Sequence, residues 1–172
     1  LIAEDDKFWK HEGFDYEAIQ KAFEKDLKAK KFNFGGSTIT QQLARNLYLS
    51  PEKSLIRKIS EAIITWRMEQ VLPKKRILEL YLNVVEWGNG IFGVEAASRH
   101  YYGKPSSELN PEEAARLASI LPNPKRYNPV GDQRYVTNRS NIIYSIMIQR
   151  GIVIPEYKEV IGGNESSLSE KE

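Results

Sequence analysis

A short polar block at residues 35–46 carries the strongest chemical signal in the sequence. It reads Gly35-Gly36-Ser37-Thr38-Ile39-Thr40-Gln41-Gln42-Leu43-Ala44-Arg45-Asn46. Hydroxyls, carboxamides and a guanidinium can hydrogen-bond an oxygen-rich ligand, and the two glycines let the backbone approach it closely. The block therefore predicts a binding site for a sugar, a phosphate or both. The structural alternative is a glycine-rich turn that leads into a polar helix.

Three adjacent acids at positions 4–6 stand just before Phe8, Trp9 and His11. A carboxylate that is held against an aromatic ring loses hydration, so its pKa rises and it becomes useful as a general base or acid. The alternative is a solvated acidic cluster at a helix start. A lone histidine is more often a hydrogen-bonded structural residue than a catalytic partner, and we expect the structural role for His11.

A third group, Arg57, Lys58 and Glu61, has the i, i+1, i+4 spacing that brings side chains together on a helix. A carboxylate flanked by two permanent cations is suited to binding pyrophosphate or another polyanion. The alternative is an exposed ion-pair face that contributes only a few tenths of a kcal/mol, in the range of about 0.2–1 kcal/mol. The binding interpretation is stronger if this face meets residues 35–46.

Other kinds of site find little support in the composition. The chain has no cysteine and two histidines, which excludes disulfides and thiolate metal sites and argues against zinc. No Walker-type phosphate loop is present, and Ser37 lacks the strand–turn–helix setting of a nucleophile elbow. The net charge of +2 does not indicate nucleic acid as a partner.

The elements that must position these groups are almost all helical. At 172 residues, with 41% hydrophobic and 28% charged residues, the chain suits one globular domain. Capping residues, prolines and glycines predict helices at about 15–30, 50–72, 73–83, 94–102, 111–121 and 133–150. We expect a loop at 87–90 and a disordered tail at 162–172.

The predicted helix at 50–72 starts with the Ser50-Pro51 pair and carries an apolar stripe of the kind that usually faces a core. That stripe consists of Leu55, Ile59, Ala62, Ile63 and Trp66. No apolar run reaches the roughly 18 residues that a membrane helix needs. Because the sequence opens without an initiator methionine, we expect a fragment whose N-terminal membrane anchor is missing.

Taken in order, the blocks resemble the family 51 glycosyltransferases, and most closely the monofunctional biosynthetic peptidoglycan transglycosylases. The four matching motifs are Glu4-Asp5-x-x-Phe8-x-x-His11-x-Gly13, the run Gly35–Gln42, Arg57-Lys58-x-x-Glu61, and Lys74-x-x-Ile77-Leu78-Glu79-x-Tyr81-Leu82-Asn83. The segments 87–104 and 121–124 resemble the monofunctional branch. The resemblance covers roughly residues 1 to 150.

Two positions depart from the family pattern. Arg45 stands where the family usually has lysine, which keeps the positive charge but changes its geometry. The fifth motif, normally two arginines before an apolar pair, is present as Asn138-Arg139-x-x-Ile142-Ile143, so only Arg139 is retained.

The resemblance implies an all-α, lysozyme-like domain over residues 1–161, with a large helical lobe and a small mobile jaw lobe within roughly 25–55. It implies polymerisation of lipid II into β-1,4-linked glycan, with inversion at C1 of the donor MurNAc and release of undecaprenyl pyrophosphate. Glu4 would take the proton from the 4-hydroxyl of the acceptor GlcNAc. The domain would act at the outer face of the bacterial cytoplasmic membrane.

The resemblance also assigns roles to the remaining motif residues. Arg45, Arg57 and Lys58 would neutralise the leaving group, and Glu61 would orient those cations or assist at the donor site. Side chains expected to hold sugar or phosphate oxygens are Ser37, Thr38, Gln41 and Gln42. Residues expected to support the motifs structurally are Phe8, His11, Gly36, Asn83 and Arg139.

No cofactor is firmly implied, and a divalent cation, Mg²⁺ or Mn²⁺, near Glu61 at the pyrophosphate site stays open. The implied partners are lipid II, the growing glycan acceptor, the membrane surface and other cell-wall synthesis proteins.

Two other functions compete with this one. A muramidase or lytic transglycosylase would use a similar helical fold and one glutamate, but cleavage of a neutral glycoside needs no cationic clamp such as Arg57 and Lys58. A non-enzymatic module could bind anionic membranes through the basic stretches 21–31 and 74–76.

Overall fold

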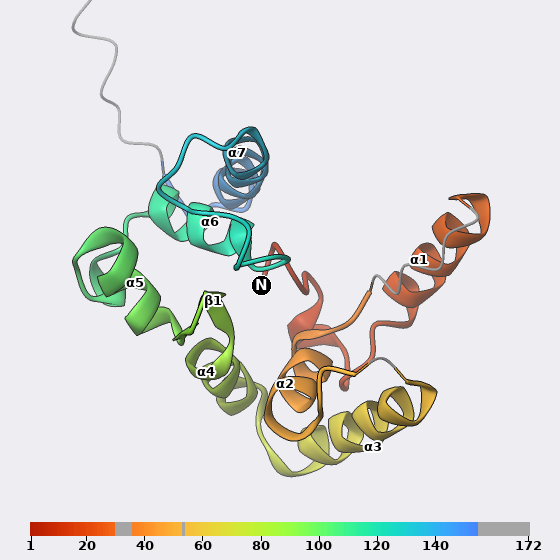
Figure 1. Ribbon diagram of the computed structural model, residues 1–172. Helices are drawn as coiled ribbons and strands as arrows, with labels where there is room; N and C mark the ends of the chain where they lie inside the picture. Colours follow the sequence, from red (N-terminus) through yellow and green to blue (C-terminus); the bar gives the residue numbers. More distant parts are fainter. Residues whose placement is uncertain (30–35, 53, 155–172) are drawn as a thin grey trace, which may run out of the picture.

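The computed structural model describes residues 1–29, 36–52 and 54–154 and confirms the expected all-α fold (Figure 1). The α-helices are α1 (Tyr16–Ala29), α2 (Ile39–Tyr48), α3 (Leu55–Val71), α4 (Lys74–Val84), α5 (Val94–Tyr102), α6 (Pro111–Ile120) and α7 (Arg134–Gln149). Shorter elements are the 3-10 helices η1 (Phe8–Lys10) and η2 (Ser106–Glu108) and the strands β1 (Glu86–Gly88) and β2 (Ile91–Phe92). Gly35, part of the expected jaw lobe and the expected tail at 162–172 lie outside the described residues.

Several helix boundaries follow the predicted capping chemistry. The Asp15 carboxylate accepts a hydrogen bond from Ala18 N at 2.9 Å at the start of α1. Asn110 and Glu113 form the expected capping box of α6, in which each side chain accepts from the other's backbone N–H. Helix α5 ends at Gly103, whose φ of 69° is the left-handed conformation that glycine adopts readily.

The predicted start of α3 at Ser50-Pro51 is wrong by about one turn. The helix begins at Leu55, because the Ser54 hydroxyl accepts a hydrogen bond from Arg57 N at 3.0 Å and so takes the capping role.

Two further differences lie between α4 and α5. Asn83 does not end α4 but lies in its last turn, where its side-chain amide donates to Glu79 O at 2.8 Å. The expected loop at 87–90 is a turn only in part: Trp87 and Gly88 belong to β1, and Asn89 and Gly90 connect β1 to β2 in a small antiparallel hairpin. Strands of two and three residues are too short to give an alternating pattern in the sequence.

Residues 39–46 of the polar block lie on helix α2. Helix α2 packs against both α3 and α4, while α6 packs against α7 (Figure 1). In α2, the side chains of Ile39, Leu43 and Ala44 are buried in one core cluster together with Phe8 and Ile77. Neighbouring helices therefore hold this segment from two sides, which suits a helix that must present polar side chains in fixed positions.

Helix α3 is oriented opposite to the expectation from its apolar stripe. Glu61, Thr65 and Met68 form its buried side. We call the outward side the α3 apolar face; its residues are between 55% and 79% exposed and are Leu55, Ile56, Ile59, Ile63 and Trp66. The stripe faces outward because α3 packs on α2 through the side that carries the buried glutamate. Within the described ranges, every helix is too short or too polar to cross a lipid bilayer.

Candidate active site

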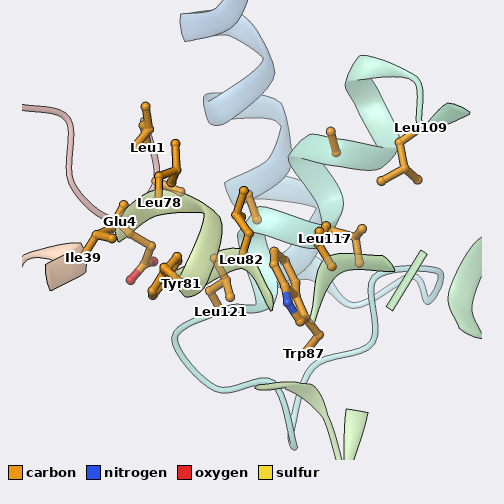
Figure 2. Close-up of a pocket in the computed structure, with 14 residues that line it drawn as sticks. Leu1, Glu4, Ile39, Leu78, Tyr81, Leu82, Trp87, Leu109, Leu117 and Leu121 are labelled. Atoms are coloured by element: carbon orange, nitrogen blue, oxygen red, sulfur yellow. The ribbon is translucent and has the colours of Figure 1, made fainter. Parts of the chain in front are cut away.

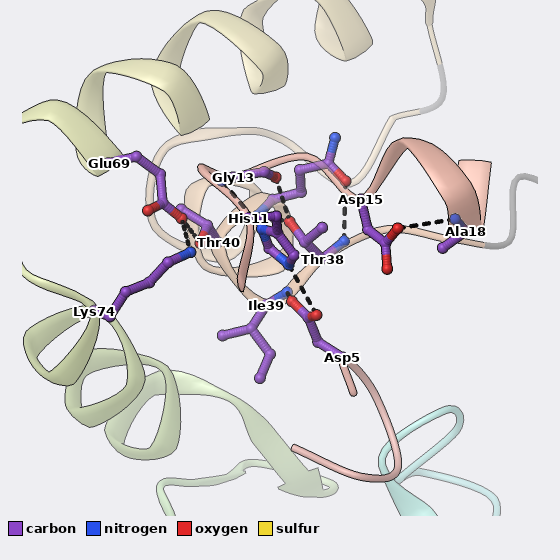
Figure 3. Close-up of polar contacts among 11 residues, drawn as sticks. Asp5, His11, Gly13, Asp15, Ala18, Thr38, Ile39, Thr40, Glu69 and Lys74 are labelled. Carbon is purple, nitrogen blue, oxygen red and sulfur yellow. Dashed lines mark hydrogen bonds and ion pairs between the residues drawn. The ribbon is translucent and has the colours of Figure 1, made fainter. Parts of the chain in front are cut away.

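Asp5 anchors the acidic segment to the start of α2. Its carboxylate accepts a hydrogen bond from Ile39 N at 2.9 Å through one oxygen and from His11 Nε2 at 2.9 Å through the other (Figure 3). An acid at the first turn of a helix also interacts favourably with the helix dipole. Residues 4–6 are therefore fixed relative to the polar block, as the first two motifs require if they form one site.

Both ring nitrogens of His11 are hydrogen-bonded within the protein, which supports the structural role expected for it. Its Nδ1 accepts a hydrogen bond from Gly13 N at 3.2 Å, which assigns the ring proton to Nε2 and makes that nitrogen the donor to Asp5. Gly13 in turn accepts from the Thr38 hydroxyl at 2.7 Å (Figure 3). Gly13 has a φ of 88°, and a Cβ there would lie 2.8 Å from Thr65 Cγ2, so no larger residue fits.

Two polar side chains of the block are used by the helix itself. The Thr38 hydroxyl accepts from Gln41 N at 3.2 Å, and Gln41 Oε1 accepts from Thr38 N at 3.0 Å, so together they form the capping box of α2. Both side chains are buried. Ser37 is partly exposed just before the cap, and Gly36 has a φ of 100°. Ser37 is therefore better placed than Thr38 or Gln41 to meet a ligand.

A buried polar cluster ties the same region to α3 and α4. The Thr40 hydroxyl and Lys74 Nζ both donate to Glu69 Oε1, at 2.5 Å and 2.8 Å (Figure 3). Lys74 Nζ also lies 4.5 Å from the centre of the Phe8 ring, a cation–π distance. Lys74 therefore serves the fold and is not a free cation of the basic stretch 74–76.

Side chains from α2 and α7 contact the Glu4 carboxylate. Gln42 Nε2 donates to one oxygen of this carboxylate at 3.2 Å, and Arg139 Nη2 lies 3.4 Å from the other. Arg139 also donates to Ala3 O at 3.0 Å, so it holds the backbone beside Glu4. The Tyr81 hydroxyl donates to Gln42 Oε1 at 3.1 Å and completes the group.

The surroundings of Glu4 are mainly apolar. Glu4 lines a cavity of about 200 Å³ whose other walls include Leu78, Tyr81, Leu82 and Trp87 (Figure 2). Burial raises the pKa of Glu4, and the hydrogen bond from Gln42 and the charge of Arg139 oppose that rise only in part. A carboxyl group in such a setting is a candidate general base.

The aromatic residues that line the cavity with Glu4 are therefore not the expected ones. The sequence pointed to Phe8 and Trp9, but Phe8 packs in the core below Lys74 and Trp9 is half exposed. Tyr81 and Trp87 come from α4 and β1, about 80 residues further along the chain.

Glu61 forms a second cluster on α3, and this cluster is not an exposed ion-pair face. The Glu61 carboxylate is fully buried, with one oxygen bound by Arg57 Nη1 at 2.9 Å and the other by Lys58 Nζ. Arg57 Nε is buried and has no partner among the described residues. The glutamate therefore holds two cations in place, and Arg57 keeps a hydrogen-bond donor unused.

The contacts of Glu61 also decide whether a divalent cation fits beside it. Both Glu61 oxygens are occupied by cationic side chains, and the described residues contain no group of three or more acids or histidines arranged for a metal ion. Mg²⁺ and Mn²⁺ prefer several oxygen ligands. The residues around Glu61 do not fit such a cation.

Arg45 adds positive charge on the Glu4 side of α2. It follows Gln42 by three residues and therefore lies on the same side of the helix. Burial and the charge of Glu4 raise the pKa of Tyr81, and the Arg45 charge opposes that rise. Among the described residues, no hydrogen bond or ion pair joins the Glu4 group to the Glu61 group.

Comparison with protein-family models matches residues 1–148 to a family described as Transglycosylase. The chain belongs to this transglycosylase family. The family expected from the motifs is thereby confirmed. The match extends over all four motifs and includes Arg139.

Curated relatives of this transglycosylase-family chain carry a common name, biosynthetic peptidoglycan transglycosylase. The protein of Dechloromonas aromatica is 60% identical over 128 residues, which are 74% of this chain and 55% of the relative. The protein of Azoarcus sp. is 62% identical over 127 residues, which are again 74% of this chain and 55% of the relative. The protein of Methylobacillus flagellatus is 52% identical over 147 residues, 86% of this chain and 64% of the relative. The matched part thus spans between 55% and 64% of these three relatives.

Sequence reasoning assigned no role to two residues that organise the candidate site of this transglycosylase-family chain. Asp5 connects the first motif to α2, and Tyr81 reaches Gln42 from α4. Tyr81 lies on the buried side of α4 together with Ile77. A tyrosine in an apolar stripe usually has a polar partner for its hydroxyl, and this signal could have identified it.

Proposed function

We propose that this chain is the glycosyltransferase domain of a peptidoglycan polymerase, which joins lipid II units into β-1,4-linked glycan. The observation that carries the proposal is Glu4, a partly buried carboxyl group with a raised pKa at the wall of an apolar cavity. Membership of the transglycosylase family and the names of the curated relatives support it.

In the proposed step, Glu4 accepts the proton of the 4-hydroxyl of the acceptor GlcNAc. The oxygen attacks C1 of the donor MurNAc from the side opposite the pyrophosphate, and the new C–O bond forms as the bond to the phosphate oxygen breaks. The electron pair leaves with undecaprenyl pyrophosphate, and the configuration at C1 inverts. Because its raised pKa makes Glu4 a stronger base than an ordinary carboxylate, it is suited to this proton transfer.

The cations are proposed to bind the leaving group. Arg57 and Lys58, held by the buried Glu61, would neutralise the charge that develops on the pyrophosphate, and Arg45 would add to it. Fixed cations cost no reorganisation during the reaction, so Glu61 would act by keeping them in place. We propose that Ser37 and Gln42 contact substrate oxygens, whereas Thr38 and Gln41 maintain the start of α2.

We further propose that the α3 apolar face rests on the outer leaflet of the bacterial cytoplasmic membrane, next to the jaw lobe expected at 25–55. Exposed apolar patches mark interaction surfaces, and Trp66 is of the type enriched at membrane–water interfaces. A substrate with an undecaprenyl chain is itself embedded in the membrane, so a domain that rests there would meet it directly.

Polymerisation of purified lipid II tests the function. The wild type should form glycan strands, Glu4→Gln should form none, and Glu17→Gln, a matched change at an exposed acid on α1, should retain activity. Circular dichroism and melting of all three proteins would show that loss of activity is not loss of fold. Wild-type polymerisation by Glu4→Gln would contradict the role of Glu4.

Other outcomes would identify the competing functions. Digestion of purified peptidoglycan without polymer formation would indicate a muramidase or lytic transglycosylase. Vesicle binding that falls steeply with salt and is unaffected by Glu4→Gln, with neither reaction present, would indicate a non-enzymatic module.

A further inference from the structure

The environment of Glu4 includes a hydrogen-bond chain that starts on α4. The Tyr81 hydroxyl donates to Gln42 Oε1 at 3.1 Å, and Gln42 Nε2 donates to Glu4 Oε2 at 3.2 Å. Tyr81 is only 2% exposed and its ring belongs to the core cluster. The chain thus runs from the rigid interior, through the polar block, to the carboxylate.

The direction of this chain follows from what each group can donate and accept. An ionised carboxylate only accepts hydrogen bonds, whereas a glutamine amide has an accepting oxygen at one end and a donating nitrogen at the other. A hydroxyl that donates to Oε1 of Gln42 therefore turns Nε2 toward Glu4. Without that hydroxyl the amide could present its oxygen to the carboxylate, and two acceptors facing each other repel.

We propose that Tyr81 is a positioning residue for the transfer reaction, whose hydroxyl fixes the Gln42 amide so that its nitrogen holds the Glu4 carboxylate. This inference rests on the proposed function, in which Glu4 is the general base. Tyr81 acts through Gln42 and does not itself touch the reacting atoms.

The other groups around Glu4 do not replace this contact. The charged side chains that act on Glu4 or on the Tyr81 phenol are Arg139 from α7, Arg45 from α2 and Asp5. None of them donates a hydrogen bond to Gln42 Oε1 within the described part of the chain. Burial also raises the pKa of Tyr81, so the phenol keeps its proton and stays a donor.

The test compares Tyr81→Phe with Tyr101→Phe in lipid II polymerisation. Tyr101 is a matched control, because its hydroxyl likewise makes one hydrogen bond, to Trp87 O at 3.1 Å, but does not contact Gln42 or Glu4. In Tyr81→Phe, kcat should fall by about tenfold with KM within about twofold of the wild type. Because the ionised form of Glu4 loses an oriented donor, the acid limb of the kcat profile should move to higher pH. Tyr101→Phe should change neither quantity.

A double variant separates positioning from packing. If Tyr81 acts through Gln42, Tyr81→Phe should have little further effect on kcat in a Gln42→Ala background. A full, additive tenfold loss in that background would overturn the inference, as would wild-type kcat and pH dependence in Tyr81→Phe alone. If Tyr81→Phe fails to fold, Gln42→Met replaces it in the test. Gln42→Met should then show the same fall in kcat and the same shift of the acid limb to higher pH. Wild-type kcat and pH dependence in Gln42→Met would overturn the inference.

The activity of Glu4→Gln distinguishes failure of the proposed function from failure of the positioning role of Tyr81. An active Glu4→Gln would remove the proposed base and the positioning role together. An inactive Glu4→Gln beside a wild-type-like Tyr81→Phe would remove only the role of Tyr81.

Discussion

Replacing Thr38 with alanine removes one hydroxyl that holds the first two motifs together. The hydroxyl accepts from Gln41 N at the start of α2 and donates to Gly13 O at 2.7 Å. The residue is 2% exposed, so water cannot readily replace either bond. We therefore expect Thr38→Ala to act on stability rather than on substrate affinity.

The size of the effect follows from these two bonds. Loss of a helix N-cap costs about 1 kcal/mol. A buried carbonyl left without its donor costs roughly 1–3 kcal/mol. The expected loss in the free energy of unfolding is therefore about 2–4 kcal/mol, which for a domain of this size lowers Tm by roughly 5–15 °C.

Thermal and urea unfolding of two variants would measure this cost. Ser54→Ala is the matched control, because Ser54 caps α3 in an exposed position with a single bond to Arg57 N. It should lose only about 1 kcal/mol, or roughly 2–4 °C in Tm. Binding of lipid II by Thr38→Ala, measured well below its Tm, should match the wild type. A Thr38→Ala protein as stable as Ser54→Ala but weaker in binding would refute the reasoning and return Thr38 to the substrate-binding residues.

Three further changes should have distinct effects. Arg57→Ala should lower the free energy of unfolding, measured in urea, by about 3–5 kcal/mol, because it leaves the buried Glu61 with one cation. An unchanged urea midpoint would contradict a buried ion pair between Arg57 and Glu61. The folded-state pKa of Glu4 is raised, so the stabilising contribution of Glu4 is present at low pH and is lost as the pH rises through that pKa. Glu4→Gln should therefore be more stable than the wild type near pH 7.5 and should lose this advantage near pH 4. An equal difference in stability at both pH values would contradict the burial argument. Gly93→Ala should lower Tm, since a Cβ at this residue of φ 86° would lie 2.8 Å from Asn83 O, and an unchanged Tm would show that the backbone adjusts.

Local chemistry predicted much of this fold correctly. The caps at Asp15 and Asn110 and the stop at Gly103 depend on neighbouring residues, so each could be read from a few positions. The misplaced start of α3 has the same local origin, because both Ser50 and Ser54 are capping residues and the sequence alone did not rank them.

The arrangement of the site was less accessible to sequence reasoning. Motif spacing pointed to Glu4, but its apolar neighbours and its partner Arg139, 135 residues away, depend on tertiary packing. The apolar stripe of α3 misled for a related reason. Periodicity shows that a helix has an apolar side, but not whether that side meets protein, since the buried side here carries Glu61.

Two arginines about three turns apart hold the acidic segment: Arg139 in α7 and Arg150 at the C-terminal cap of that helix. Arg139 binds Ala3 O, and Arg150 pairs with both oxygens of Asp6, across sequence separations of 136 and 144 residues. Contacts of such long range close late, because the intervening chain must first be ordered. A nascent chain that exposes Glu4 early in synthesis thus gains its complete surroundings only after α7 has docked. The order of synthesis would delay activity until the whole domain has folded.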